Sequence, residues 1–206
     1  MASEKLNKHE QKTKETRACL LKAAEEIFLR DGYERAELGE IAKLAGRTKG
    51  AIYAQFDSKE DVFLALTETH ALRRRAMMRE LLASSDSVED NLVAFRTLFM
   101  TFVEDSTWGQ LLLEFKLYAL RHPESRENLQ RVYETIIEGS QEQRYTDLLG
   151  PAAKGKQAIT RTAAVHSLFA MLTGLVLESK FDPNAVSEES VKRIADRLFN
   201  AIIVAK

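Results

Sequence analysis

Apolar residues recur along this chain with the spacing of α-helices. In the segment 16–30, Leu20, Ala24, Ile27 and Phe28 stand at i, i+4, i+7 and i+8, which places them on one face of a helix. Comparable patterns predict helices over about 38–45, 49–56, 58–82, 92–103, 107–122, 124–149, 157–179 and 188–203. No segment alternates convincingly in the manner of a strand. The chain is therefore expected to be all-α, with about nine helices.

Two of these predicted helices are short and lie next to each other. The segments 38–45 and 49–56 are separated only by Gly46-Arg47-Thr48. Glycine commonly follows the end of a helix, and a threonine hydroxyl can accept a hydrogen bond from a free amide in the first turn of the next one. Two short helices joined by such a turn are typical of a helix-turn-helix.

Composition supports a globular, helical chain. Of the 206 residues, 45% are hydrophobic and 30% charged, while 9 glycines and 3 prolines leave room for long helices. The single cysteine, Cys19, allows no internal disulfide and no cysteine-rich zinc site. Neither an apolar leader nor an uncharged apolar stretch of about 18 residues is evident. We therefore expect a cytoplasmic protein with no metal, no cofactor and no membrane partner.

The charge is distributed unevenly. The net charge is −1, from 30 basic and 31 acidic residues. Segment 1–22 nevertheless carries six Lys or Arg against three Glu, or +3, and segment 43–59 carries four against a single Asp, also +3. Two basic segments near one end suit a surface that faces phosphates, although solvated helix faces carry similar charge runs.

The segment 41–61, IAKLAGRTKGAIYAQFDSKED, resembles the DNA-binding signature of the TetR (AcrR-like) family of bacterial transcriptional regulators. The resemblance covers about residues 17–66. It implies a flexible basic arm over 1–15, a helix-turn-helix DNA-binding domain over 16–61, and an effector-binding and dimerisation domain over 62–206. The N-terminal domain would contain three helices.

The resemblance also assigns roles to residues of the motif. It places Thr48 at the N-terminus of the recognition helix and gives Tyr53 and Lys59 contacts to backbone phosphates, which fix register without reading sequence. Base readout would fall to Arg47, Lys49, Ala51 and Gln55, whose side chains suit guanine, the thymine methyl or adenine.

This chain departs from the family pattern at three positions. Arg47 replaces an apolar turn residue, Glu37 replaces a capping Ser or Thr, and Ala54 replaces an aromatic residue.

The remaining helices are expected to hold an effector and to form a homodimer. A hydrophobic or amphipathic small molecule is the expected effector, and plain core packing is the alternative for the residues of the candidate pocket: Met77, Phe99, Met100, Phe102, Trp108, Phe115 and Tyr118. The last two helices are apolar enough to leave a large exposed patch on a monomer. The expected dimer interface contains His166, Phe169, Ala170, Thr173, Leu177, Ile194, Leu198 and Ile202.

The sequence thus predicts a ligand-responsive transcriptional repressor that binds a palindromic operator as a dimer. Two alternatives stay open: a DNA-binding regulator without an effector, and an activator. An enzyme is disfavoured because no dinucleotide, phosphate-loop, zinc-protease or nucleophile-elbow motif occurs, and the four histidines lie far apart in the chain.

Overall fold

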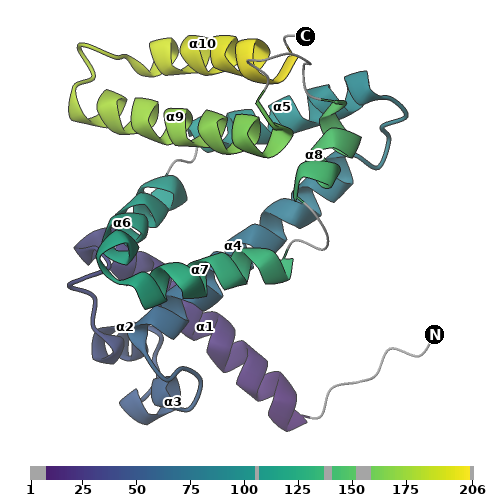
Figure 1. Cartoon of the computed structure of the whole chain (residues 1–206). Helices are drawn as coiled ribbons and strands as arrows, with labels where there is room; N and C mark the ends of the chain where they lie inside the picture. The colour runs from purple at the N-terminus through teal and green to yellow at the C-terminus, as the bar shows by residue number, and fades with distance from the viewer. Residues whose placement is uncertain (1–7, 105–106, 137–140, 152–158, 205–206) are drawn as a thin grey trace. The chain divides into compact units, whose positions relative to one another are not determined.

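The computed structural model describes residues 8–104, 107–136, 141–151 and 159–204. Within these ranges it contains ten α-helices, a terminal π-helical turn and no strand, which confirms the all-α prediction (Figure 1). The elements are α1 Lys8–Asp31, α2 Leu38–Leu44, α3 Lys49–Tyr53, α4 Lys59–Leu81, α5 Val88–Glu104, α6 Thr107–Arg121, α7 Pro123–Ile136, α8 Gln141–Leu149, α9 Arg161–Phe181, α10 Glu188–Phe199 and η1 Asn200–Val204.

The two largest differences from the expected boundaries concern the segment 124–149 and the start of α1. The helix predicted over 124–149 is two helices, α7 and α8, and residues 137–140 between them lie outside the described part. Helix α1 begins at Lys8, so the second half of the segment expected to be a flexible arm is helical. Charged or polar helix formers (Lys, Glu and Gln) dominate 8–15, and they extend α1 beyond its apolar stripe.

Side-chain caps fix several helix ends, including the one at Thr48 that the sequence predicts. The hydroxyls of Thr48 and Ser187 accept hydrogen bonds from the amides of Ala51 and Ser190, at 3.2 Å each. Ser58 and Asp61 form a reciprocal pair at the start of α4, and Ser87 and Asp90 form an equivalent pair at the start of α5. Each such cap satisfies an amide that the helix itself leaves free.

The chain divides into two compact units, residues 1–70 with 114–133, and residues 71–113 with 134–206. This division describes packing. The expected functional boundaries, 16–61 for DNA binding and 62–206 for effector binding and dimerisation, stay a prediction.

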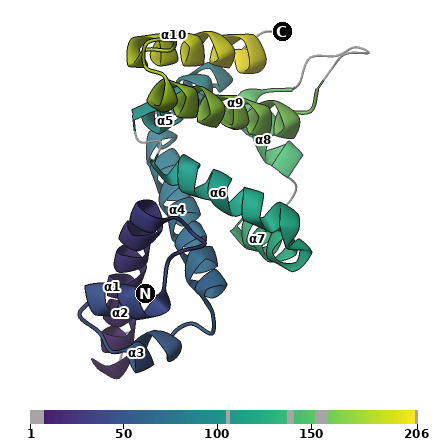
Figure 2. The same ribbon diagram turned by 90° about the vertical axis from the view of Figure 1, so that its left-hand side faces the viewer.

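The first unit is built around Tyr33, which follows α1 and is 2% exposed. The rings of Phe28, Phe63, Phe115 and Tyr118 surround it, with centroids 4.8–5.8 Å away and edge-to-face or tilted geometries. Helices α1, α2 and α3 of this unit lie together in Figure 2. The C-terminal part of α6 thus belongs to the core that supports the helix-turn-helix.

The second unit is a helical layer formed by α5, α8, α9 and α10. Its core contains Phe95, Phe99, Leu168, Ala195 and Phe199, all at most 4% exposed. Helices α9 and α10 lie side by side in both ribbon views (Figures 1 and 2). Arg96 of α5 and Asp196 of α10 form an ion pair at the edge of this layer.

A buried arginine ties three elements of the second unit together. The guanidinium of Arg161, at the start of α9, donates to the carbonyls of Leu149, Gly150, Pro151 and Ile203, at 2.8–3.1 Å. Three of these carbonyls lie at or just beyond the C-terminal end of α8, where helix carbonyls lack intrahelical partners and attract cations. Burial lowers the pKa of Arg161.

Helix α9 is long and apolar enough, by length and composition alone, to cross a membrane. In the structure its buried residues, including Val165, Leu168 and Leu172, pack into the core of the second unit. A third of this apolar stretch is buried within the chain.

Candidate nucleic-acid interface

Helices α2 and α3 form a tight helix-turn-helix whose turn is fixed by backbone hydrogen bonds. The amide of Gly46 bonds to the carbonyl of Lys43 at 3.1 Å, and that of Arg47 bonds to Ala42 at 2.8 Å. This pair is the Schellman arrangement, which requires a left-handed residue just past the helix. Gly46 has φ +64°, so the glycine predicted to end α2 is required by the backbone there.

The recognition helix α3 has one buried side and one exposed side. Ile52 is fully buried and Phe56, just after α3, is 4% exposed, whereas Tyr53 is 49% exposed. Arg47, Thr48 and Lys49 are exposed as well. Of the other predicted base-contacting residues, Ala51 and Gln55 are half-buried. Six of the seven predicted DNA-contacting residues therefore lie on or beside α3, within nine positions of one another, and the seventh, Lys59, begins α4.

Arg17 of α1 holds the C-terminal end of the recognition helix, a role that sequence analysis did not predict. Its Nη1 donates to the carbonyl of Gln55 at 3.3 Å, and its guanidinium lies 4.3 Å from the centre of the Phe56 ring. The contact joins residues 38 positions apart. In the sequence, Arg17 is one of six basic residues in segment 1–22 and has no further distinguishing signal.

Lys59 is held within the chain. Its Nζ donates to the carbonyl of Glu34 at 2.7 Å and lies 4.9 Å from the centre of the Tyr33 ring. Burial lowers the pKa of Lys59, and the carboxylates of Glu34 and Glu37 oppose that effect. An ammonium group has three donors, so Lys59 can accept a phosphate partner while keeping its bond to Glu34.

The three departures from the family pattern have distinct structural consequences. Glu37 stands at the N-cap of α2 and forms no side-chain cap. The side chain of Arg47 is exposed and its Nη1 lies 3.5 Å from the carbonyl of Gly46, so it is oriented toward solvent and its own turn. Ala54 is the exposed C-cap of α3, next to Tyr53.

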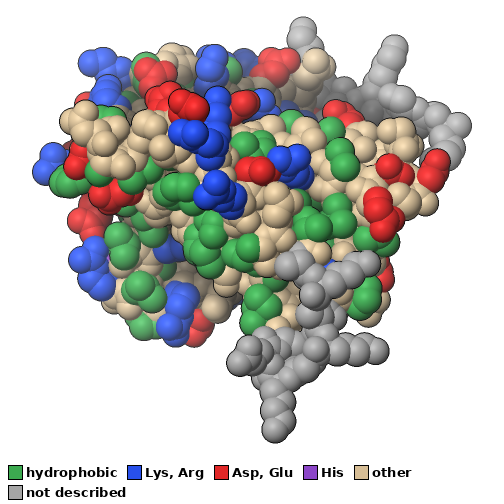
Figure 3. All heavy atoms as spheres, turned by 90° about the horizontal axis from the view of Figure 1, so that it is seen from above, with side chains coloured by type: hydrophobic (Ala, Val, Ile, Leu, Met, Phe, Trp, Pro, Cys, Tyr) green, Lys and Arg blue, Asp and Glu red, His purple; other side chains and the backbone are tan. Residues whose placement is uncertain are grey.

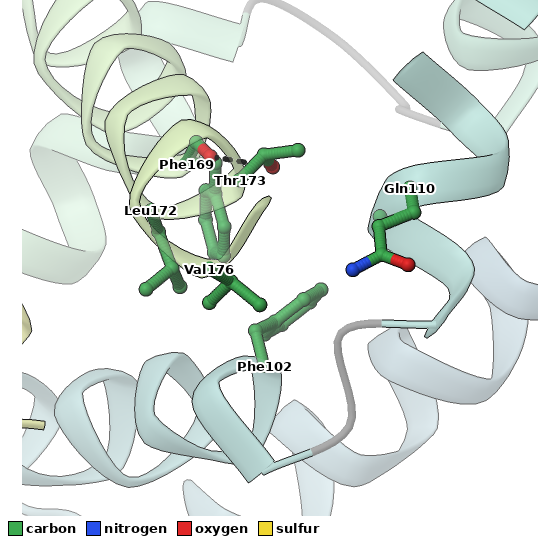
Figure 4. Close-up of a pocket in the computed structure, with 7 residues that line it drawn as sticks. Phe102, Gln110, Phe169, Leu172, Thr173 and Val176 are labelled. Carbon is green, nitrogen blue, oxygen red and sulfur yellow. Dashed lines mark hydrogen bonds between the residues drawn. The ribbon is translucent and has the colours of Figure 1, made fainter. Parts of the chain in front are cut away.

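A small pocket occurs in the second unit, lined by Phe102, Gly109, Gln110, Phe169, Leu172, Thr173 and Val176 (Figure 4). Its free space is about 20 Å³, enough for about one water molecule. The hydroxyl of Thr173 donates to the carbonyl of Phe169 at 2.9 Å. None of the residues that the structure describes gives a hydrogen-bond partner to the buried Nε2 of Gln110, and Figure 4 shows this atom pointing into the pocket.

The residues expected to line an effector pocket are dispersed. Phe102 lines the observed pocket, whereas Phe99 is buried in the core of the second unit and Met100 packs against that core. Trp108 is 6% exposed and Met77 is 38% exposed. Phe115 and Tyr118 pack around Tyr33 in the first unit.

The residues expected at a dimer interface all lie on α9, α10 and η1. His166, Ala170, Leu177 and Ile194 are exposed. Four others are half-buried: Phe169 and Thr173, which line the pocket, and Leu198 and Ile202, which pack partly against the core. His166 Nε2 lies 3.1 Å from the Oε1 of Gln141. Among the residues described, no three His, Cys, Asp or Glu side chains are grouped so as to hold a metal ion.

Comparison with known proteins supports the interpretation of this site. Residues 20–66 match the family model described as bacterial regulatory proteins, tetR family. The chain is 33% identical over 99 residues to the transcriptional activator FasR of Mycolicibacterium smegmatis, and 42% identical over 74 residues to the transcriptional regulator TtgR of Pseudomonas putida. These segments cover 48% and 34% of this chain and span only 45% and 35% of the two relatives.

Solved structures show the same fold over nearly the whole chain. A putative transcriptional regulator from Saccharomonospora viridis in complex with choline aligns with a TM-score of 0.70 at 16% identity, covering 94% of this chain and 100% of that one. The fatty acid degradation regulator FadR from Bacillus halodurans aligns with a TM-score of 0.65 at 20% identity, covering 91% and 96%. The helix-turn-helix segment 20–66 thus matches the tetR family of bacterial regulatory proteins, and it stands on an all-helical fold shared with solved regulators.

Proposed function

We propose that this protein is a transcriptional regulator that binds double-stranded DNA through the exposed side of α3. The observation that carries the proposal is the geometry of the recognition helix. Its buried side is fixed by Ile52 and Phe56, while Arg47, Lys49 and Tyr53 are left exposed together. The cationic groups of Arg47 and Lys49 can bind phosphates or the edges of guanine bases, and the hydroxyl of Tyr53 can bind a phosphate.

Within this interface, Tyr53 and Lys59 bind backbone phosphates and Arg47, Lys49, Ala51 and Gln55 meet base edges. The exposed N-terminus of α3, capped by Thr48, adds amide donors and the positive end of the helix dipole. Phosphate contacts set the register of the protein on the duplex, and contacts from the side chains of α3 to the bases determine which sequence it prefers.

The protein acts as a homodimer in this proposal, through α9 and α10. Several large apolar side chains of these helices and of η1 are 38–85% exposed in the single chain: Met171, Leu177, Phe181, Ile194 and Val204. Figure 3 looks down on this part of the molecule, where hydrophobic side chains lie between charged ones. A twofold dimer would present two α3 helices and so recognise a near-palindromic site.

A small-molecule effector binds in the pocket of the second unit and shifts the protein away from the DNA-binding conformation. The lining is mostly apolar. The Nε2 of Gln110, which no described residue pairs, would bind one hydrogen-bond acceptor on the ligand. The guanidinium of Arg74 lies 4.8 Å from the centre of the Phe102 ring, which disfavours a second cation beside that ring. A neutral, apolar compound with a carbonyl or similar oxygen fits best.

The pocket must open to admit such a compound, because its free space is only about 20 Å³. Phe102 and Phe169, whose rings meet edge to face at 4.8 Å, are the side chains that would move. The choline complex of the Saccharomonospora viridis regulator shows that a protein of this fold is found with a small molecule, but choline is a cation and the pocket here suits a neutral compound.

We propose repression as the outcome of DNA binding, with an operator that overlaps a promoter and an effector that releases the protein. Activation is the second candidate, because FasR is an activator. A regulator without an effector is the third, if the pocket holds only water. All three place the protein in the bacterial cytoplasm, at the nucleoid when bound to DNA.

Selection of random duplex DNA by the purified protein tests the proposal. We expect enrichment of one near-palindromic sequence and a strong dependence of its affinity on salt. Tyr53→Phe should weaken binding to every sequence, whereas Gln55→Ala should relax the preference at one position in each half-site. Failure to enrich any sequence, or a monomer at micromolar concentration, would contradict the proposal.

A further inference from the structure

Lys59 is held in place by the turn that follows α1. Its ammonium group bonds to the carbonyl of Glu34 at 2.7 Å and lies over the ring of Tyr33. A lysine side chain has four rotatable bonds and usually samples many positions, so two such contacts restrict its amine to one place. The position of the Lys59 amine therefore depends on where Tyr33 and Glu34 lie.

Tyr33 and Glu34 are in turn fixed by a carboxylate from α6. The Oε1 of Glu114 accepts a hydrogen bond from the backbone amide of Tyr33 at 2.7 Å. The same oxygen lies 2.6 Å from the position that a Cβ would occupy on Gly32, whose φ is +81°. The carboxylate thus fills the inside of this turn, and only glycine at position 32 leaves it the space.

Packing alone does not account for a carboxylate at this position. Its helix neighbours Phe115 and Tyr118 already pack against the Tyr33 ring, with centroids 4.8 and 4.9 Å away. Desolvating a carboxylate costs free energy unless it receives hydrogen bonds, and an apolar side chain would pack here without that cost. Glu114 adds a charged acceptor for the backbone amide of Tyr33. A hydrogen bond to a charged acceptor is stronger than one to a neutral group.

We propose that Glu114 is a positioning residue for DNA binding. By holding the amide of Tyr33 it fixes the carbonyl of Glu34, and through that carbonyl it places the Lys59 ammonium where a DNA phosphate binds. Glu114 itself touches no DNA. This inference rests on the proposed DNA-binding function and adds to it a residue 55 positions away from Lys59 in the chain.

The dependence of DNA affinity on salt provides the test, because its slope counts phosphate contacts at about 0.9 per contact. With the full-length protein and the selected duplex, Lys59→Ala should lower the slope by about 0.9 per subunit. Glu114→Leu should lower it by the same amount, and the double variant should lower it no further. Glu114→Gln keeps an oxygen acceptor for Tyr33 and should retain the wild-type slope.

A matched control separates positioning from loss of stability. Val191→Ala removes buried methyl groups from α10, in the second unit, where Val191 is 3% exposed. It should lower thermal stability and leave the slope unchanged. All variants are compared at a temperature where circular dichroism shows each to be folded.

Hydrogen exchange of the Tyr33 amide gives a readout that needs no DNA. We expect exchange at least tenfold faster in Glu114→Leu than in wild type, and near wild type in Glu114→Gln. An unchanged exchange rate in Glu114→Leu would overturn the inference, as would a wild-type salt slope for that variant or an additive loss in the double variant.

A wild-type slope in Lys59→Ala would overturn the inference as well, because Lys59 would then contact no phosphate. That result would leave sequence-specific DNA binding intact. Failure of the wild-type protein to bind any duplex would remove the proposed function and this inference together.

Discussion

Two polar side chains of α6, one helical turn apart, have opposite hydrogen-bonding states. Glu114, in the first unit, accepts from the amide of Tyr33 at 2.7 Å. Gln110, in the second unit, has a buried Nε2 for which no described residue serves as a partner. Buried polar groups are nearly always paired, and each exception requires an explanation. Glu114 therefore has the hydrogen-bond partner that a buried polar group requires, whereas Gln110 keeps a donor that the proposed effector would satisfy.

The largest effect on stability is expected from replacing Glu114, the side chain that is hydrogen-bonded. Glu114→Leu leaves the Tyr33 amide, in a residue 2% exposed, without an acceptor. Leaving such a donor unpaired costs about 1–3 kcal/mol of folding free energy. Urea denaturation followed by circular dichroism should show that loss for Glu114→Leu and a smaller one for Glu114→Gln. Equal stability of wild type and Glu114→Leu would mean that water replaces the carboxylate without cost.

Replacing Gln110 should change the stability in the opposite direction. Gln110→Leu removes a buried donor that no described residue pairs, so stability should stay the same or rise by up to about 1 kcal/mol. The same denaturation experiment measures it. A loss of more than about 1 kcal/mol would show that the Gln110 amide has a structural partner and that the two ends of α6 do not differ.

A change at Gly109 fills the pocket without breaking a hydrogen bond. A Cβ there would lie 3.6 Å from the Oγ1 of Thr173, an ordinary contact distance. Replacing a helical glycine with alanine usually stabilises by about 0.5–1 kcal/mol. Gly109→Ala should therefore gain stability. It should also lose the thermal shift that we expect acetophenone, a neutral aromatic carbonyl compound, to produce in the wild type. Cumene, which has a similar shape and no acceptor, is the matched probe and should shift the wild type less.

The smallest effect concerns a carboxylate that is paired within the second unit. Glu142 of α8 accepts from the amides of Thr162 and Arg161 at 2.7 and 2.8 Å, and these bonds lower its pKa below the ordinary 4.5. A lowered pKa in the folded state stabilises the protein above the unfolded value, and this contribution disappears as the pH falls from about 4.5 through the folded pKa. The stability difference between wild type and Glu142→Gln should therefore shrink across that range. A difference that stays constant from pH 7 to pH 3 would contradict this assignment.

The sequence predicted the parts of the molecule that short-range rules determine. Gly46, Thr48 and Ser58 act on amides or carbonyls within a few residues, so their roles could be inferred from spacing alone. The exposed side of α3 followed from the resemblance of segment 41–61 to one family. The all-helical fold followed from apolar periodicity.

The remaining features depend on contacts between distant positions. Glu114 meets Tyr33 across 81 residues and Arg161 meets Ile203 across 42, and no local pattern signals either pair. The Nε2 of Gln110 points into a pocket that is also lined by residues of α5 and α9, which spacing along α6 does not indicate. For Phe115 and Tyr118 the resemblance left two alternatives, a ligand pocket and plain core packing. Both rings pack around Tyr33, a contact between distant positions that the sequence does not show.

The most direct test compares ligand-free DNA affinity across wild type, Gln110→Leu and Glu114→Leu, each titrated with salt on the same duplex. The account predicts that Gln110→Leu retains the wild-type affinity and slope, whereas Glu114→Leu binds more weakly with a slope lower by about 0.9 per subunit. A lower slope for Gln110→Leu, or a wild-type slope for Glu114→Leu, would contradict the account.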